Sequence, residues 1–290
     1  MQTESNSSLS TFRDCPRLYR YKYIDMLVPD KTSESLSLGL LGHNAMEIYY
    51  KDGLPAALEM LTNFDADDQD KVLRIGKVKA LLNGYVANYG LQDFDKVLEV
   101  ETEFKIPMVN PETGHKSNKV ELVGKIDLIA EKNGENWLID HKFKGTVGER
   151  DFWSINSQMD LYLNAFKEKY NCKGIIWNII RTPSIRQTQK ETLEQYLERL
   201  GEDVKIRPEF YYTRFVMPRW DEDIKESMQD IWDVHDHLLR VARTGKFYRN
   251  TSCCHKFGTC QFLPLCANGL DKDSFVKKEK KHSELQEVVF

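Results

Sequence analysis

Two aspartates and one lysine within Glu121–Lys144 have the spacing of a catalytic carboxylate site. Two apolar, alternating runs flank Asn133-Gly134, a dipeptide that favours a type I′ hairpin turn because both residues tolerate positive φ. In such a hairpin the numbers of directly opposed residues sum to 267, so Asp127 and Asp140 face each other. Their Cβ atoms would lie about 4.5–5.5 Å apart. Lys142, two residues further on, points to the same face.

Two carboxylates in direct opposition repel each other and destabilise an ordinary sheet. A divalent cation between the two aspartates, with the lysine beside it, would remove this penalty. The alternative interpretation is a solvated hairpin face that carries unrelated charges. The apolar neighbours Ile126, Leu128 and Ile139 place both aspartates inside apolar runs, which favours a metal site.

The elements expected around this hairpin are both helical and extended. Apolar residues at helical spacing predict helices, and alternation or a short β-branched run predicts strands. We expect helices over 8–25, 36–50, 51–95 (with a loop near 65–70), 154–170, 184–200 and 220–241, and strands over 97–108, 174–181 and 210–217. Pro16 lies too far inside the first helix to be tolerated, so we expect a break after Cys15.

Side-chain patterns within these elements lead to further expectations. Glu99, Glu101 and Glu103 share one face of strand 97–108. One of them could join a metal site, but we interpret the face as solvated and leave all three out. Ile155 and Trp220 fall in the apolar stripes of their helices, so we expect both in the core.

Length and charge restrict the class of protein. A chain of 290 residues can bury a large core in one domain or two small ones. The net charge of −4 argues against nonspecific coating of nucleic acid, although it allows a local basic groove. No apolar run reaches the length of a membrane span, and the polar N-terminus lacks a signal-peptide core. We therefore expect a cytoplasmic protein without membrane contact.

The cysteines indicate a second site. Cys254, Cys260 and Cys266 are evenly spaced near the C-terminus, and a metal centre needs a fourth thiol. Cys15 is one candidate because a Cys-Pro step occurs in some iron–sulfur ligation runs; Cys253 is a rival ligand. We expect Cys172, at a helix-to-strand junction, to be a buried structural thiol. Four thiolates suit either a 4Fe–4S cluster or a structural zinc, and the spacing does not choose between them; a disulfide is disfavoured in a reducing compartment.

Six motifs in a fixed order then resemble one family. The sequence is similar to the RecB-type branch of the PD-(D/E)XK nuclease superfamily in its iron–sulfur form, which includes phage exonuclease-like proteins, nuclease domains of recombination helicases and CRISPR-adaptation nucleases. The motifs are S-x-S-T-F-x-x-C-P at 8–16, G-x-x-G-H at 39–43, G-x-I-D at 124–127, I-D-H-K at 139–142, Q-x-x-x-Y at 158–162 and the three-cysteine segment at 254–266.

The resemblance implies a role for each matching residue. His43, Asp127, Asp140 and the backbone carbonyl of His141 would bind Mg²⁺ or Mn²⁺. Lys142 would orient or activate the attacking water and stabilise developing charge. The remaining implied residues are Gln158 and Tyr162, which would position the DNA backbone, and Cys15, Cys254, Cys260 and Cys266, which would hold a 4Fe–4S cluster. Asp140 stands where many relatives have Glu.

The resemblance also implies a fold and an activity. We expect an α/β, restriction-endonuclease-like core with a central mixed β-sheet flanked by helices, its N- and C-terminal segments joined by the Fe–S cluster. The expected division is a single nuclease domain over 1–270 (a helical N-terminal segment over 1–95, a catalytic core over 96–218, a helix and cysteine cluster over 219–268) and a charged tail over 271–290.

The implied function is metal-dependent DNA exonuclease activity on single-stranded or duplex ends, in a bacterial or phage-infected cell. Recombination, helicase or CRISPR-adaptation proteins are the implied partners. Two alternatives come from other classes: a noncatalytic DNA-binding or assembly subunit with a nuclease-like fold, and a zinc-stabilised interaction protein.

Overall fold

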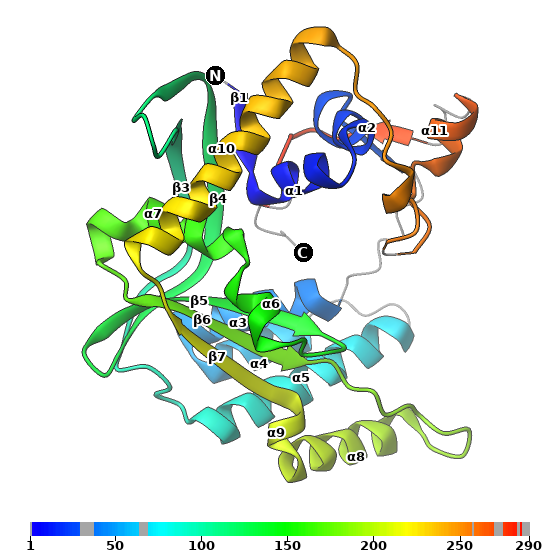
Figure 1. Ribbon diagram of the computed structural model, residues 1–290. Helices are drawn as coiled ribbons and strands as arrows, with labels where there is room; N and C mark the ends of the chain where they lie inside the picture. The colour runs from blue at the N-terminus through cyan, green and yellow to red at the C-terminus, as the bar shows by residue number, and fades with distance from the viewer. Residues whose placement is uncertain are drawn as a thin grey trace. The chain divides into compact units, whose positions relative to one another are not determined.

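The computed structural model describes residues 2–29, 38–63, 69–256, 258–269, 275–282 and 285. The chain forms two compact units, which we describe separately. The terminal unit contains Met1–Ser35, Glu103–Lys125 and Asp221–Glu287. The hairpin unit contains Leu36–Thr102 and Ile126–Trp220. Figure 1 shows the course of the chain.

The terminal unit begins with strand β1 (Gln2–Ser5) and helix α1 (Asn6–Asp14). The side chain of Ser5 accepts a hydrogen bond from the Ser8 backbone and the Ser8 side chain accepts one in return, a capping box that starts the helix. The helix ends where Cys15 adopts an extended conformation, and Pro16 is the first residue of helix α2 (Pro16–Tyr19). The predicted break after Cys15 is therefore confirmed, because proline is tolerated at the first helical position and not further in.

The C-terminal segment contributes ordered structure to this unit. Strand β8 (Phe275–Lys277) pairs antiparallel with β2 (Leu27–Pro29). Further along, Lys281 Nζ lies 2.7 Å from the buried carboxylate of Glu4. The other elements of the unit are the π-helical turn η1 (Arg20–Ile24), helix α10 (Asp221–Thr244), the 3₁₀ turn η2 (Thr251–Cys253) and helix α11 (Leu263–Asn268).

The hairpin unit holds the remaining helices. They are α3 (Leu38–Asp52), α4 (Leu54–Asn63), α5 (Gln69–Tyr89), α6 (Arg150–Ser154), α7 (Ser157–Tyr170), α8 (Leu193–Ile206) and α9 (Pro208–Tyr211). The helix expected over 184–200 is wrong in its first half. Thr192 and Gln195 form a capping box that starts α8 at Leu193, and such a box fixes a helix start locally. Most of the loop expected near 65–70 lies outside the described residues.

The strands of the hairpin unit, together with two longer strands that are only partly within it, form the mixed sheet that the resemblance implies. Strand β5 (Glu135–Lys144) pairs antiparallel with β4 (Lys116–Lys132) and parallel with β6 (Gly174–Arg181). Strand β7 (Tyr212–Pro218) then pairs antiparallel with β6. Strand β3 (Lys96–Val109) pairs with β4. The predicted α/β fold with a central mixed sheet flanked by helices is confirmed.

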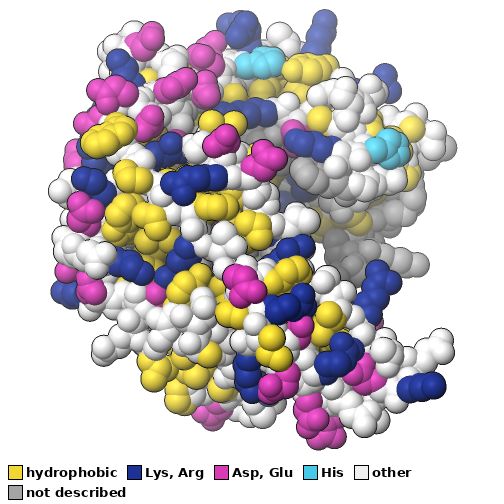
Figure 2. Space-filling model, turned by 60° about the horizontal axis from the view of Figure 1, so that its bottom comes forward, with side chains coloured by type: hydrophobic (Ala, Val, Ile, Leu, Met, Phe, Trp, Pro, Cys, Tyr) yellow, Lys and Arg dark blue, Asp and Glu magenta, His cyan; other side chains and the backbone are white. Residues whose placement is uncertain are grey.

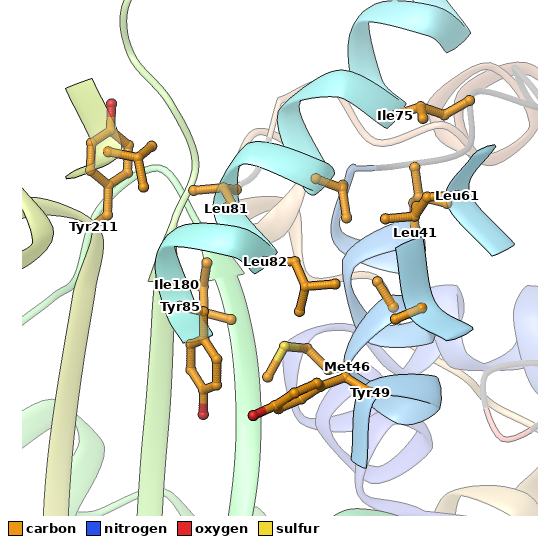
Figure 3. Packing of buried hydrophobic residues seen from close by; sticks show 14 of the residues in the cluster. Leu41, Met46, Tyr49, Leu61, Ile75, Leu81, Leu82, Tyr85, Ile180 and Tyr211 are labelled. Atoms are coloured by element: carbon orange, nitrogen blue, oxygen red, sulfur yellow. The ribbon is translucent and has the colours of Figure 1, made fainter. Parts of the chain in front are cut away.

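Helices α3 and α5 cover one face of this sheet, and α6 lies on the other (Figure 1). Figure 3 shows the packing of the covered face, where Leu41 and Met46 of α3 meet Leu82 and Tyr85 of α5 and Ile180 of β6. All are buried. Helix α3, which carries the predicted ligand His43, is thus held against the sheet by a continuous apolar core.

Two core expectations are wrong. Ile155 is 80% exposed because the chain breaks between α6 and α7, which takes this residue out of the helical stripe. Trp220 is 64% exposed and lies just before α10. Lysine and arginine side chains are interspersed with acidic ones on the face that Figure 2 shows. Among the residues that the structure describes, no helix is both long and apolar enough to cross a membrane.

Candidate active site

The predicted hairpin forms in the predicted register. Asn133 and Gly134 have φ values of 55° and 74°, as a type I′ turn requires. The ladder runs from Lys132↔Glu135 to Leu128↔Ile139, and each pair sums to the expected value. The ladder ends one pair before Asp127 and Asp140. Beyond that point a side chain can accept a backbone hydrogen bond in place of the opposite strand's carbonyl.

Next to the end of the ladder, the carboxylate of Asp127 serves as a hydrogen-bond acceptor for the backbone of β5. Its Oδ2 accepts a hydrogen bond of 2.7 Å from the backbone N–H of His141. This bond anchors the carboxylate to β5 between Asp140 and Lys142. The aspartate from β4 and the two charged residues of β5 therefore meet at one point.

Asp140 and Lys142 form a buried ion pair on β5. The distance from Asp140 Oδ2 to Lys142 Nζ is 2.6 Å, and the two side chains are 3% and 23% exposed. Burial raises the pKa of Asp140 to about 6; Lys142 opposes this rise and Asp127 adds to it. Burial would lower the pKa of Lys142, but the carboxylates of Asp140 and Asp127 outweigh it and the pKa is raised. The lysine is therefore charged at neutral pH.

His43 lies on the other side of Asp127. The distance from His43 Nδ1 to Asp127 Oδ2 is 3.4 Å. Burial would raise the pKa of Asp127, but the charge and hydrogen bond of His43 outweigh it, so the pKa lies well below its ordinary value. The two aspartates thus have pKa values shifted in opposite directions, a pattern typical of carboxylates with separate roles.

The glycine before His43 explains how α3 reaches this point. A Cβ at Gly42 would lie 2.4 Å from the ring of Phe143 on β5, far inside van der Waals contact. The His43 and Phe143 rings are 5.7 Å apart. Only glycine lets the helix approach the strand this closely, which accounts physically for the glycine just before His43 in the motif.

Glu101, which the sequence places on an expected solvated face, lies beside His43 and Asp127 in the structure. Ligand atoms of His43, Glu101 and Asp127 all lie within 4.8 Å of one another. Glu101 has φ = 52° inside strand β3, a left-handed conformation that costs a non-glycine residue about 1 kcal/mol or more. Such a residue interrupts the alternation of a strand and turns its side chain out of the regular pattern. The three alternating glutamates were the available signal, but alternation alone could not show this turn.

Gln158 and Tyr162 meet on helix α7. Gln158 Nε2 donates to the Tyr162 hydroxyl at 3.2 Å. The side chain of Asn156 caps the helix by accepting from the Gln158 backbone, and Arg219 pairs with the buried Asp160 at 3.0 Å. These contacts fix the orientation of α7, so the predicted pair is held rigidly on one helix face.

The terminal unit contains a cavity of about 230 Å³ lined by four cysteines. Its walls also include Leu18, Tyr21 and Phe262 and the guanidinium-bearing residues Arg17 and Arg249. Positive side chains and an apolar wall suit a negatively charged thiolate centre. The four lining cysteines are Cys15, Cys254, Cys260 and Cys266.

The neighbouring Cys253 has other contacts. Its thiol donates to the backbone carbonyl of Asp14 at 2.9 Å, and Asn250 Nδ2 lies 3.4 Å from its sulfur. Asn250 also donates its backbone N–H to Cys15 Sγ. Cys254 rather than Cys253 therefore lines the cavity. Cys172, expected to be buried, is partly exposed, and the burial that it has raises the pKa of its thiol to about 12.

Comparison with known proteins assigns the family. The family model of the PD-(D/E)XK nuclease superfamily matches residues 3–267. The chain belongs to this superfamily. Both halves of the PD-(D/E)XK signature thus lie on the hairpin described above, and membership supports nuclease activity in general.

Two solved structures are similar to the PD-(D/E)XK chain. A Eubacterium rectale protein to which exonuclease activity has been attributed is 9% identical, with a TM-score of 0.48 and coverage of 93% of this chain and 94% of that one. The protein SSO0001 is 15% identical, with a TM-score of 0.27 and coverage of 79% and 84%. At these values neither likeness adds to the assignment. The comparison with curated proteins found no match.

Proposed function

We propose that the protein is a divalent-metal-dependent deoxyribonuclease that degrades DNA from its ends. The observation that carries this proposal is the group formed by His43, Glu101 and Asp127, next to the buried Asp140–Lys142 pair. Carboxylates and imidazole at one point suit a divalent cation, and the adjacent lysine suits a phosphate. Superfamily membership supports nuclease activity, and the motif order supports DNA ends as the substrate.

The residues present fit Mg²⁺ or Mn²⁺. The Asp140 carboxylate is 3% exposed, and its Oδ2 pairs with Lys142 Nζ at 2.6 Å. Together with the imidazole and carboxylates of His43, Glu101 and Asp127, this buried carboxylate makes a donor set that suits a hard cation. The proposed ligands are His43, Asp127, Asp140, the backbone carbonyl of His141 and, from the structure, Glu101. Held there, the cation would lower the pKa of a water molecule and neutralise charge on the phosphate.

The other side chains act on the substrate. Lys142 is charged and largely buried, so it can orient the attacking water and stabilise charge that develops on the phosphate. Gln158 and Tyr162 would bind the DNA backbone near the scissile bond. Their mutual hydrogen bond orients both groups before DNA binds.

In the terminal unit, we propose that Cys15, Cys254, Cys260 and Cys266 bind a 4Fe–4S cluster. Four thiols around an apolar cavity provide the donor set of such a cluster. Because the cysteines come from both ends of the sequence, the cluster would tie these ends together. We propose the cluster as a structural element and assign it no role in hydrolysis.

End-labelled single- and double-stranded DNA, with and without Mn²⁺, tests the enzymatic proposal. Wild type should release short products only with the metal. Asp140→Ala and Lys142→Ala should abolish cleavage and retain DNA binding, measured by fluorescence anisotropy. Asp203→Asn provides the control, since this aspartate of α8 pairs with Arg207, the residue that follows the helix. Full activity of both active-site variants across a metal titration would refute the proposal.

A noncatalytic DNA-binding or assembly subunit is the alternative that the same assay addresses. That protein would bind DNA in the anisotropy measurement and release no products from any substrate. The complete set of His43, Asp127, Asp140 and Lys142 favours the enzyme, because a degenerate copy has no need to keep every member.

A further inference from the structure

A buried polar network lies behind the proposed metal site, on the face of β5 opposite Asp140 and Lys142. At its centre is His141, which is 2% exposed. The His141 ring stacks on the ring of Tyr50, with centroids 5.5 Å apart and an interplanar angle of 12°. Its Nδ1 lies 2.7 Å from Nδ2 of Asn178, the residue directly beside it on β6. Asn178 thus contacts the edge of the His141 ring, and Tyr50 covers its face.

Arg214 determines the orientation of the Asn178 side-chain amide. Arg214 Nε donates to Asn178 Oδ1 at 3.0 Å. A guanidinium group has donors only, so the oxygen of the amide must face it and the NH₂ group must face away. That NH₂ group donates to the hydroxyl of Tyr85 at 3.2 Å and to Nδ1 of His141. His141 Nδ1 is therefore an acceptor, and the ring proton lies on Nε2.

Arg214 is itself held on two sides. Its guanidinium forms a two-pronged pair with Asp93, in which Nη1 lies 2.6 Å from Oδ1 and Nη2 contacts Oδ2. The Asp93 and Arg214 side chains are 3% and 9% exposed. The ring of Tyr89 lies against the guanidinium carbon at 3.6 Å from its centroid. A bidentate ion pair fixes the orientation of the guanidinium as well as its distance. Asp93 therefore orients Arg214, Arg214 orients the Asn178 amide, and that amide donates to His141.

The network ends at the proposed ligands through the backbone of His141. The N–H of this residue donates to Asp127 Oδ2, and its carbonyl is a proposed ligand. A shift of the His141 main chain would therefore disturb two ligands at once, and the contacts of its buried side chain oppose such a shift. The motif implies a role for the backbone carbonyl of His141 and none for its side chain.

We propose that Asn178 and Arg214 are positioning residues that hold the His141 main chain in the geometry for metal binding. This inference rests on the proposed function. Partners outside the ligand set commonly change metal affinity by about 10- to 100-fold when they are removed. A role in folding alone would lower stability and leave the affinity unchanged.

The test measures Mn²⁺ affinity of the full chain without DNA, by isothermal titration calorimetry and by the Mn²⁺ electron paramagnetic resonance signal. Asn178→Leu removes every hydrogen bond of the amide at similar volume and should weaken Mn²⁺ binding by about 10-fold or more. Tyr212→Phe is the matched control. It removes another buried hydrogen bond, from the Tyr212 hydroxyl to the Leu81 carbonyl, and should leave the affinity within about twofold of wild type.

A second variant, isosteric with asparagine, tests the same role without placing a leucine in the buried polar network. Asn178→Asp can still accept from Arg214 but presents an acceptor to His141, so the ring must place a proton on Nδ1. Long-range ¹H–¹⁵N spectra should show the proton of His141 on Nε2 in wild type and on Nδ1 in this variant, together with weaker Mn²⁺ binding.

Wild-type affinity in both Asn178 variants, or an Nδ1 proton in wild type, would overturn the positioning role. Failure of the proposed function looks different. In that case the wild type itself would bind no Mn²⁺, or Asp140→Ala would bind it as well as wild type does.

Discussion

Replacement of Asp140 by asparagine should stabilise the metal-free protein while it removes a proposed ligand. Burial raises the pKa of this carboxyl from 3.8 to about 6, with Lys142 opposing and Asp127 adding to the shift. The folded state then binds the proton more tightly than the unfolded state does. Stability from this group is fully present below pH 3.8 and is lost as the pH rises through about 6.

The size of the effect follows from the same values. At about 1.4 kcal/mol per pH unit, a rise from 3.8 to about 6 costs about 3 kcal/mol of unfolding free energy at pH 7. Asparagine has no charge to bury, and its oxygen can still accept from Lys142, although more weakly by about 1 kcal/mol. We therefore expect Asp140→Asn to gain about 2 kcal/mol at pH 7 in EDTA and nothing at pH 4.

Urea unfolding followed by the fluorescence of the five tryptophans measures this gain; one of them, Trp177, has its ring centroid 5.5 Å from Lys142 Nζ. Asp127→Asn is the internal contrast. The pKa of Asp127 is lowered on folding, so its stabilising effect is present above its ordinary pKa and lost at low pH, and its replacement should destabilise at pH 7. An equal response of the two variants, or a gain for Asp140→Asn at pH 4 as large as at pH 7, would refute the reasoning. Added Mn²⁺ should stabilise wild type more than either variant.

Three further substitutions test the approach of α3 to the sheet, the proposed ligand set and the proposed cluster. Gly42→Ala should push Phe143 away, displace His43 and lower the cleavage rate by about 10-fold or more; Gly201→Ala, with open space around its Cβ, should leave the rate unchanged, and equal rates would contradict the close-approach argument. Glu101→Gln should weaken Mn²⁺ binding by about 10-fold in calorimetry, whereas an unchanged affinity would remove this residue from the ligand set. Cys254→Ser should abolish the brown colour and the absorbance near about 400 nm of anaerobically purified protein, and loss of colour in Cys253→Ser alone would reverse the ligand assignment.

The elements that depend on local sequence were predictable. The turn at Asn133-Gly134 follows from positive φ at two adjacent residues, and β6 has the predicted bounds of Gly174–Arg181. The break at Pro16 follows from proline geometry. Helix ends set by side-chain capping were less predictable. Helix α8 starts late, at Leu193, because the helical spacing of residues in the sequence begins before the capping residue, whereas the helix begins after it.

The amino-acid sequence by itself determined the chemistry available at this site: an Asn-Gly turn that sets Asp127 near Asp140, and a lysine two residues beyond. Only the tertiary structure decided which further groups reach it. The left-handed backbone at Glu101 brings that side chain to His43, and the pairing of Asp93 with Arg214 sets the hydrogen bonds behind His141. These contacts join residues far apart in the chain, and their geometry depends on how helices pack on a sheet, which no local pattern of residues contains.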